Sequence, residues 1–239
     1  MTTSIIACEV MREELLAILG SPHDRLVQFV SMGLHVSPKK LRTELQSRIL
    51  ELQQHDRIVL GFGLCGEATA GLLSPRVPLI IPRVADCIPL LLGAAAQHRA
   101  RPFPEQGTFY LSGGWVEGER NLLTEHERAV NKFGEHKARR ALNTLFAPYQ
   151  RLLFIRTGHP RERECLEKAK RFAKISGLAL ETKDGQSAWL TRLVHGPWAA
   201  EEFLRVEPNH LTTTDSFNQP RGCRTSAQPN AVSRSSTQH

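Results

Sequence analysis

The chain has 239 residues, of which 41% are hydrophobic and 23% charged, an ordinary balance for a globular protein. This length suits one large domain or two small halves, and it allows a buried core without disulfide staples. No apolar run approaches the roughly 20 residues that a membrane-spanning helix needs, and residues 1–11 lack the features of a secretory signal. We therefore expect a cytoplasmic protein whose five cysteines are thiols, metal ligands or core residues.

The net charge of +7 is unevenly distributed along the chain. Residues 128–174 contain 13 Lys and Arg against four Asp and Glu, so the rest of the chain is slightly acidic. Such a stretch could dock an acidic partner, and it could equally form two solvated helix faces. With 6% aromatic residues and no signature of a nucleic-acid module, nucleic acid is not the expected partner.

In the first part of the chain, short apolar runs alternate with helical patterns. Leu15, Leu16 and Leu19 share one helix face, and Ser37-Pro38 has the composition of a helix start. The predicted strands are 3–8, 26–32, 57–64 and 79–81, and the predicted helices are 12–19, 38–53, 68–73 and 88–97. Near-continuous apolar strands separated by helices predict an α/β fold with a parallel, doubly wound-like sheet that is covered on both faces.

The second part repeats this style less regularly, which suggests two similar α/β halves with a subdivision near residues 105–120. The predicted strands are 108–111, 152–155, 179–181 and a weaker 203–206, and the predicted helices are 125–145, 161–174 and 188–193. We expect one α/β domain over residues 1–208. Residues 209–239 have almost no large apolar side chain, and this composition predicts a disordered tail that includes Cys223.

Three of the five cysteines follow the ends of predicted strands. They are Cys8, Cys65 and Cys87, and His35 comes just after a fourth strand. Because ligands of open parallel sheets bind outside the carboxyl ends of the strands, these side chains could meet in space. Three thiolates and one imidazole are a sensible zinc site, whereas the three cysteines alone could hold a four-iron cluster with one iron open. The alternative is that the cysteines are core residues and that His35 caps a strand.

Two acidic residues adjoin these cysteines in the sequence. Glu9 follows Cys8 and Asp86 precedes Cys87, so either carboxylate could be a ligand or could orient one. Cys65, Glu9 and Asp86 are the candidates for a catalytic role. Trp115 and His159 also follow strand ends and could line the same crevice.

Residues 61–66 read Gly-Phe-Gly-Leu-Cys-Gly and satisfy the glycine fingerprint of dinucleotide-binding proteins. The motif follows the third strand rather than the first, and Asp86 lies beyond a Pro82-Arg83 break. Nucleotide binding is therefore the minor alternative. We interpret Gly61, Gly63 and Gly66 as cofactor-site glycines that let backbone approach a ligand beside Cys65.

Several motifs together resemble a prokaryotic domain family of unknown function, whose members often accompany corrinoid-dependent methyltransferases. The resemblance covers residues 4–208 and is most specific in Gly-Leu-Cys-Gly and Asp-Cys-Ile. The motifs, in order, are Ala7-Cys8-Glu9-Val10, His35-x-x-Pro38-x-x-Leu41, Gly61–Gly66, Pro78–Arg83, Asp86-Cys87-Ile88, Gly107–Tyr110 and Gly114-Trp115.

This resemblance implies an accessory or catalytic component of a corrinoid (cobalamin)-dependent methyl-transfer system, with a cysteine site that binds zinc or an iron-sulfur cluster. The chain departs from the family pattern at Ala85, where histidine is expected, and at Glu67, where asparagine is common. A cobalamin-binding Asp-x-His-x-x-Gly motif is absent from the sequence, so the resemblance implies that a corrinoid protein or methyltransferase subunit carries the cobalamin. Two other hypotheses are a non-enzymatic scaffold that docks through its basic face, and methyl acceptance by a thiol of low pKa.

Overall fold

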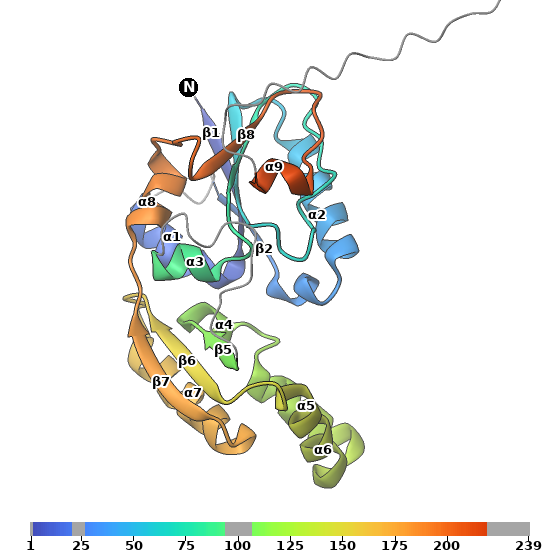
Figure 1. Cartoon of the computed structure of the whole chain (residues 1–239), viewed down its shortest axis with the longest axis vertical. Coiled ribbons are helices and arrows are strands. Elements are labelled where there is room, and N and C mark those ends of the chain that lie inside the picture. Colours follow the sequence, from blue (N-terminus) through green and yellow to red (C-terminus); the bar gives the residue numbers. More distant parts are fainter. Residues whose placement is uncertain (1, 21–26, 94–106, 219–239) are drawn as a thin grey trace, which may run out of the picture.

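A computed structural model of the chain describes residues 2–20, 27–93 and 107–218, which form two sheets flanked by helices (Figure 1). The strands are β1 Thr3–Cys8, β2 Val27–Val30, β3 Arg57–Gly61, β4 Leu79–Pro82, β5 Thr108–Leu111, β6 Arg151–Arg156, β7 Ala179–Asp184 and β8 Phe203–Val206. The helices are η1 Glu9–Met11, α1 Arg12–Leu19, η2 Met32–Val36, α2 Pro38–Glu51, α3 Ile88–Leu92, α4 Gly113–Glu117, α5 Leu122–Phe133, α6 Glu135–Phe146, α7 Glu162–Ser176, α8 Ala188–His195 and α9 Thr214–Asn218.

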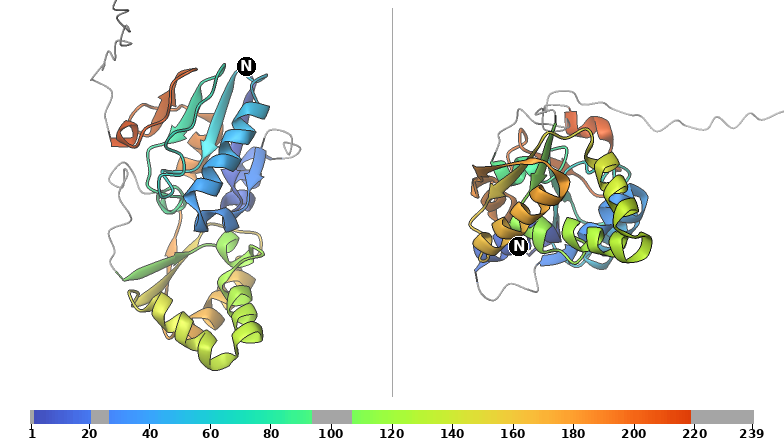
Figure 2. Two further views of the ribbon diagram at one scale, coloured as in Figure 1. Left: turned by 90° about the vertical axis from the view of Figure 1, so that its right-hand side faces the viewer. Right: turned by 90° about the horizontal axis from the view of Figure 1, so that it is seen from below.

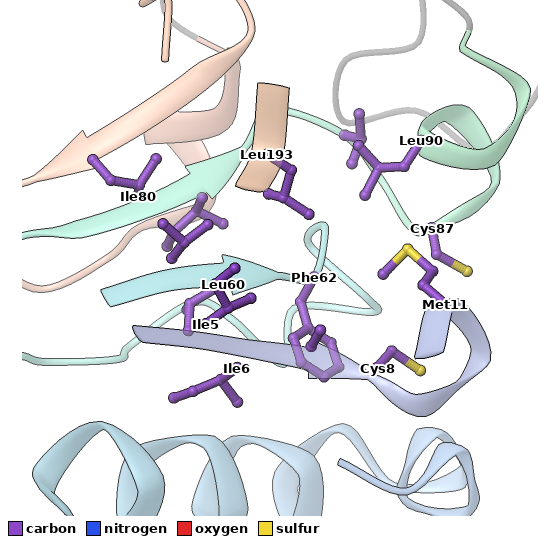
Figure 3. Packing of buried hydrophobic residues seen from close by; sticks show 14 of the residues in the cluster. Ile5, Ile6, Cys8, Met11, Leu60, Phe62, Ile80, Cys87, Leu90 and Leu193 are labelled. Carbon is purple, nitrogen blue, oxygen red and sulfur yellow. The ribbon is translucent and has the colours of Figure 1, made fainter. Parts of the chain in front are cut away.

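The first sheet has the strand order β2-β1-β3-β4-β8. Its first four strands are parallel, and β8 closes the edge antiparallel to β4. Ile6 of β1 points toward α2, whereas Leu193 of α8 packs over the opposite face (Figure 3). The predicted α/β class, with parallel strands and helices on both faces, is therefore confirmed. In this order β1 and β3 flank the position where the sheet reverses its winding, and open parallel sheets bind ligands at the carboxyl ends of such strands.

The second sheet is parallel and has the order β5-β6-β7. It has its own apolar core, in which Leu152 and Phe154 of β6 pack with Phe172 of α7 and Phe146 of α6. Figure 2 shows the two sheets one beyond the other along the length of the molecule. Because the chain returns from β7 to α8 and β8, the second sheet is inserted between two parts of the first.

Several predicted elements differ from the observed ones. Residues 68–73 form turns and a bridge residue instead of a helix. The long helix predicted at 125–145 is two helices, because Gly134 between them adopts a positive φ of 80° that helices do not contain. The helix predicted at 88–97 ends at Leu92, and residues 94–97 lie outside the described ones.

The predicted tail over 209–239 begins too early. Residues 209–218 pack on the first sheet: Thr212 donates a hydrogen bond to the carbonyl of Thr69 and accepts one from the N–H of Leu72, and Phe217 is fully buried. A few well-placed residues were enough to order a segment of polar composition. Residues 219–239, including Cys223, lie outside the described part of the chain, and the predicted division into domains stays a prediction.

The two sheets meet through the short helix α4, which lies against η1. A Cβ atom on Gly114 would come within 2.1 Å of the carbonyl oxygen of Val10, so only glycine allows this approach. A second contact links the two parts of the molecule. Oε1 of Glu14, in α1, accepts a hydrogen bond of 2.6 Å from the hydroxyl of Thr157, which follows β6. The carboxyl edge of the first sheet is thus covered by the second. No helix in the described ranges is long and apolar enough to cross a membrane.

We predict that Gly114→Ala destabilises the protein by about 1–3 kcal/mol, the usual cost of an overpacked contact. The new Cβ would clash with backbone atoms of Val10, which cannot move away by a rotamer change as a side chain can. Gly33→Ala is the matched control, because its new Cβ would meet only side-chain atoms at 3.4 Å and beyond. Urea denaturation of both variants measures the difference, and equal free energies of unfolding would contradict the close contact.

We also predict a pH-dependent effect of Glu14→Gln. Burial raises the pKa of Glu14 above its ordinary value of 4.5, and the Thr157 hydrogen bond only partly opposes this. A raised native pKa means that the wild type loses stability as the pH rises from about 4.5 through that native value, whereas glutamine has no proton to lose. The stability of the variant relative to wild type should therefore increase between pH 4 and pH 8 in denaturation experiments. A difference that is independent of pH would contradict this.

Candidate metal centre

The three strand-end cysteines lie at the same edge of the first sheet. Cys8 ends β1, Cys65 follows β3 and Cys87 follows β4. Figure 3 shows Cys8 and Cys87 at the same end of the core, where the strands finish. The pKa of each of these cysteines is raised by the charge of another: Cys65 acts on Cys8, Cys87 on Cys65, and Cys8 on Cys87. The structure therefore brings the three thiols close together.

A backbone contact between two loops places Cys65 beside Cys87. The N–H groups of Leu64 and Cys65 donate to the carbonyls of Val84 and Ala85, at 2.8 and 2.7 Å. Gly63 makes this possible, because a Cβ there would lie 2.6 Å from the oxygen of Val84. The glycine thus gives room for backbone to approach backbone.

The other two glycines of the motif have separate structural reasons. Gly61 pairs with Ala7 on the neighbouring strand, where a Cβ would lie 2.8 Å from the Ala7 side chain. Gly66 has a positive φ of 64°. No helix opens after this motif, so it lacks the helix N-terminus on which dinucleotide sites hold the pyrophosphate.

Cys65 is held in an uncommon backbone conformation. Its φ is 47°, and Gly66 and Glu67 also have positive φ values. A residue with a side chain adopts this region at a cost of about 1–3 kcal/mol, and such residues concentrate at functional sites. The turn after β3 therefore holds the Cys65 thiol in place at an energetic cost.

The thiols of this cluster are kept protonated by their surroundings. Burial raises the pKa of Cys8 to about 12, and it raises the pKa of Cys65 and Cys87 well above the ordinary value of 9.0. Negative charge on the other thiols, Glu9 and Asp86 adds to the increase. In the described part of the chain, the charged groups that act on these three sulfurs are all acidic, so a bound cation is what would favour the thiolates.

His35 lies in η2 beside this cluster, half buried between the rings of Phe62 and Trp115, at 6.2 and 6.1 Å between centroids. Burial lowers its pKa, so the imidazole is neutral at pH 7. Nδ1 lies 3.2 Å from the carbonyl oxygen of Met32, and this contact is a hydrogen bond only if Nδ1 carries the proton. Nε2 then keeps the lone pair that a metal ion requires.

A cavity of about 430 Å³ opens next to Cys87 and is bounded by both sheets. Its size is in the range of small-molecule sites. The residues at its cysteine end are His35, Asp86, Cys87 and Trp115, and rings of Phe109, Tyr110 and Tyr149 line the far end. The indole N–H of Trp115 is buried without a hydrogen bond of ordinary geometry, yet it lies near enough to the Cys87 sulfur to lower the pKa of that thiol.

The two acidic candidates differ in their surroundings. Asp86 lines the cavity, and burial raises its pKa although Oδ1 accepts a 2.8 Å hydrogen bond from the N–H of Ile88. Glu9 instead binds the turn before η2, where its Oε1 accepts from the N–H of Met32 at 2.7 Å and from the hydroxyl of Ser31 at 3.1 Å. Glu9 faces a different cavity from Asp86. Their catalytic roles stay predictions.

The spacing of the predicted ligand atoms helps to distinguish a single zinc ion from an iron-sulfur cluster. Around a tetrahedral zinc ion, thiolate sulfurs 2.3 Å from the metal stand about 3.8 Å apart. Cys8, His35, Cys65 and Cys87 do not contain three ligand atoms that all lie within 4.8 Å of one another. The sulfurs of a four-iron cluster each bind a different iron atom, so they stand farther apart than around one ion.

A second group of ligand-type side chains lies on the other side of α4, and sequence reasoning missed it. Glu117, His159 and Cys165 each place one ligand atom within 4.8 Å of the others, and within the described ranges this is the one such group. His159 was expected to line the same crevice as the cysteines, whereas it faces the cavity that contains Glu9. Glu117 belongs to α4, His159 follows β6 and Cys165 belongs to α7. They are too far apart in the sequence to form a recognisable metal-binding motif.

We predict that the cysteines of the metal-free protein react slowly with iodoacetamide. The pKa of Cys8, raised to about 12, leaves roughly a thousandfold less thiolate at pH 8 than the ordinary value of 9.0 would. Peptide-resolved mass spectrometry should show Cys8 and Cys87 alkylated at least about a hundredfold more slowly in the native than in the urea-unfolded protein. Native rates that match the unfolded ones would favour thiol-based methyl acceptance instead.

The comparisons with known proteins identify the family but give no activity. No curated protein and no solved structure matches the chain. The family described as protein of unknown function DUF1638 matches residues 29–194, which include β3, Cys65, Cys87 and the second sheet. That match covers more than half of the 239 residues, and the chain therefore belongs to the DUF1638 family.

Proposed function

We propose that this protein binds an iron-sulfur cluster, or less favourably a zinc ion, through Cys8, Cys65 and Cys87. The observation that carries the proposal is the neighbourhood of three electrostatically coupled thiols at the carboxyl ends of β1, β3 and β4. Two of the thiols, Cys8 and Cys87, are buried and that of Cys65 is half-buried. With raised pKa values and only acidic groups acting on them, they are poorly suited to be free nucleophiles. They are suited to lose their protons to solvent when a metal centre binds the thiolates.

The surroundings fit such a centre. Trp115 offers a buried N–H next to Cys87 that would donate to a sulfur ligand. His35 offers a neutral imidazole from the cavity wall, either as a further ligand or as a neighbour of an open position. The separation of the ligand atoms favours a cluster over a single ion, because their sulfurs and nitrogens are not gathered within 4.8 Å.

We further propose that the protein serves a corrinoid-dependent methyl-transfer system as an accessory or catalytic component. The support is the resemblance of its cysteine motifs to a family that accompanies such methyltransferases. A cluster would supply electrons, which suits the rescue of an over-oxidised corrinoid carried by a partner. This chain's own residues would hold the centre, exclude water through the rings of Trp115 and Phe62, and leave the cavity beside Cys87 for the reacting molecule.

A test of the metal centre is anaerobic purification followed by iron, zinc and acid-labile sulfide analysis of wild type, Cys65→Ser and Cys223→Ser. Cys65→Ser removes one ligand with almost no change of volume, and Cys223→Ser is the control outside the three-cysteine cluster. We expect stoichiometric iron and sulfide in wild type and in the control, and their loss in Cys65→Ser. Zinc without sulfide, present in wild type and lost in Cys65→Ser, would show that the three cysteines bind a single zinc ion instead of a cluster.

Iron and sulfide that survive Cys65→Ser unchanged would refute the site. An absence of metal, combined with salt-sensitive association that Cys65→Ser does not affect, would favour the scaffold hypothesis. The surface for that alternative is the basic stretch 128–174, which covers the end of α5 together with α6 and α7, and in which Phe133 and Leu145 are 54% and 61% exposed. The corrinoid link is tested separately, by whether genes of corrinoid proteins adjoin genes of this family.

A further inference from the structure

The group formed by Glu117, His159 and Cys165 has the chemistry of a metal site in its own right. Glu117 ends α4, His159 lies in the turn after β6 and Cys165 belongs to α7. A carboxylate, an imidazole and a thiolate are all zinc ligands. The His159 side chain is 2% exposed and that of Glu117 12%, and Cys165 is fully buried.

The contacts within this group are longer than good hydrogen bonds. The Cys165 sulfur lies 3.8 Å from Nδ1 of His159, and Nε2 of His159 lies 3.8 Å from Oε2 of Glu117. The second carboxylate oxygen, Oε1, is buried and makes no hydrogen bond within the described residues. Ligands around a tetrahedral zinc ion, at about 2.1 Å for nitrogen and 2.3 Å for sulfur, stand about 3.6 Å apart. Because one ion binds only one ring nitrogen, the relevant observation is that a single ligand atom from each residue lies within 4.8 Å of the other two. Nδ1 of His159 also accepts a 3.2 Å hydrogen bond from the N–H of Arg161, which an ion bound at that nitrogen would replace.

Gly113 fixes the position of the imidazole ring. A Cβ at this residue would lie 2.5 Å from Cγ of His159, so the ring packs directly on the backbone at the start of α4. The carbonyl of Gly113 also contacts the Cys165 sulfur, at 3.9 Å. Helix α4 thus supplies the carboxylate at its end and the surface against which the other two side chains are placed.

A cavity of about 240 Å³ gives an ion access to the group. Glu117 and His159 line its wall together with Glu9 and Glu13. Glu119 also lines the wall, which therefore holds four acidic side chains against two arginines, Arg12 and Arg161. This excess of acidic groups attracts cations. Cys165 is not part of the wall and lies behind the other two residues.

Two basic side chains compete for the same carboxylate. Nη2 of Arg161 lies 2.5 Å from Oε2 of Glu117, and Nζ of Lys168 lies 3.6 Å from Oε1. Their side chains are 60% and 39% exposed, so each can turn into solvent without opening the core. An entering cation would replace them at Glu117. Their removal should accordingly strengthen metal binding, which a purely structural ion-pair network would not do.

We infer that Glu117, His159 and Cys165 bind a divalent transition-metal ion of the zinc type, with an open coordination position toward the cavity. Three protein ligands and one open position are the pattern of catalytic zinc sites. The site is separate from the three-cysteine cluster, since the residues facing it line a different cavity. Cys165 gives up its thiol proton to solvent when the metal–sulfur bond forms.

The test uses Co²⁺ as the probe, added to the metal-free, reduced full-length protein in a Cys65→Ser background. The Cys65→Ser substitution weakens metal binding by the three-cysteine cluster. Absorption from thiolate-to-cobalt charge transfer reports the Cys165 bond, and Zn²⁺ competition gives the zinc affinity. We expect one Co²⁺ per chain with this absorption. Glu117→Gln and Cys165→Ser should each weaken binding by more than the roughly 10–100-fold that loss of an outer partner typically costs.

Arg161→Ala is the discriminating variant. It should bind Co²⁺ more tightly than the Cys65→Ser protein does. The control is Arg163→Ala, which removes an arginine two residues away and should leave the Co²⁺ affinity unchanged. Co²⁺ binding that Glu117→Gln and Cys165→Ser do not alter would overturn the inference, as would weaker binding by Arg161→Ala. Glu117→Gln keeps the size of the side chain, so it remains informative if Cys165→Ser fails to fold. Iron and sulfide content report only on the three-cysteine cluster, so the two sites can fail independently.

Discussion

The approach of Gly114 to the Val10 carbonyl is the contact on which the arrangement of both candidate sites depends. It presses α4 against the carboxyl edge of the first sheet, where any Cβ would force the backbones apart. Trp115, one residue on, then faces the cavity beside Cys87, and Glu117, three residues on, faces the cavity of His159. One short helix between two sheets therefore supplies side chains to two chemically distinct candidate sites.

The two sites differ in how their negative charge is balanced. The charged groups that act on Cys8, Cys65 and Cys87 are acidic, so these sulfurs remain thiols until a cation arrives. Glu117 is already paired with Arg161 and Lys168, so a metal ion must compete there with two exposed side chains. Burial thus makes the proposed thiolate site depend on a bound cation, whereas the carboxylate of the proposed second site is balanced by its own ion pairs without one.

The first sheet could be predicted from the sequence, because its apolar runs and the Ser37-Pro38 helix start are local signals. Ser37 indeed caps α2, its side chain accepting from the N–H of Lys40 at 3.5 Å. The position of the strand-end cysteines followed from parallel topology alone. The turn at 65–71 could not be predicted, because apolar residues such as Ala68 and Leu72 are buried there by tertiary contacts without any helix.

The group around His159 was missed for a related reason. Its ligands are spread over α4, a turn and α7, and their meeting depends on how the second sheet packs on the first. The order of residues 209–218 also depends on partners distant in sequence, as in the hydrogen bond between Thr212 and Leu72. The polar composition of this segment predicts a disordered tail, whereas the buried Phe217 and the Thr212 hydrogen bonds hold it against the first part of the chain.

The return of β8 to the edge of the first sheet has a consequence for the order in which the chain can fold. The second sheet lies between β4 and β8 in sequence, and its own core allows it to form while the first sheet still lacks an edge strand. During synthesis from the N-terminus, one edge of β4 therefore stays unpaired until residues 203–218, which contain β8 and α9, have been made. An open strand edge is a template for unwanted pairing. While the inserted sheet is being synthesised, the free edge of β4 is therefore open to pairing with other chains.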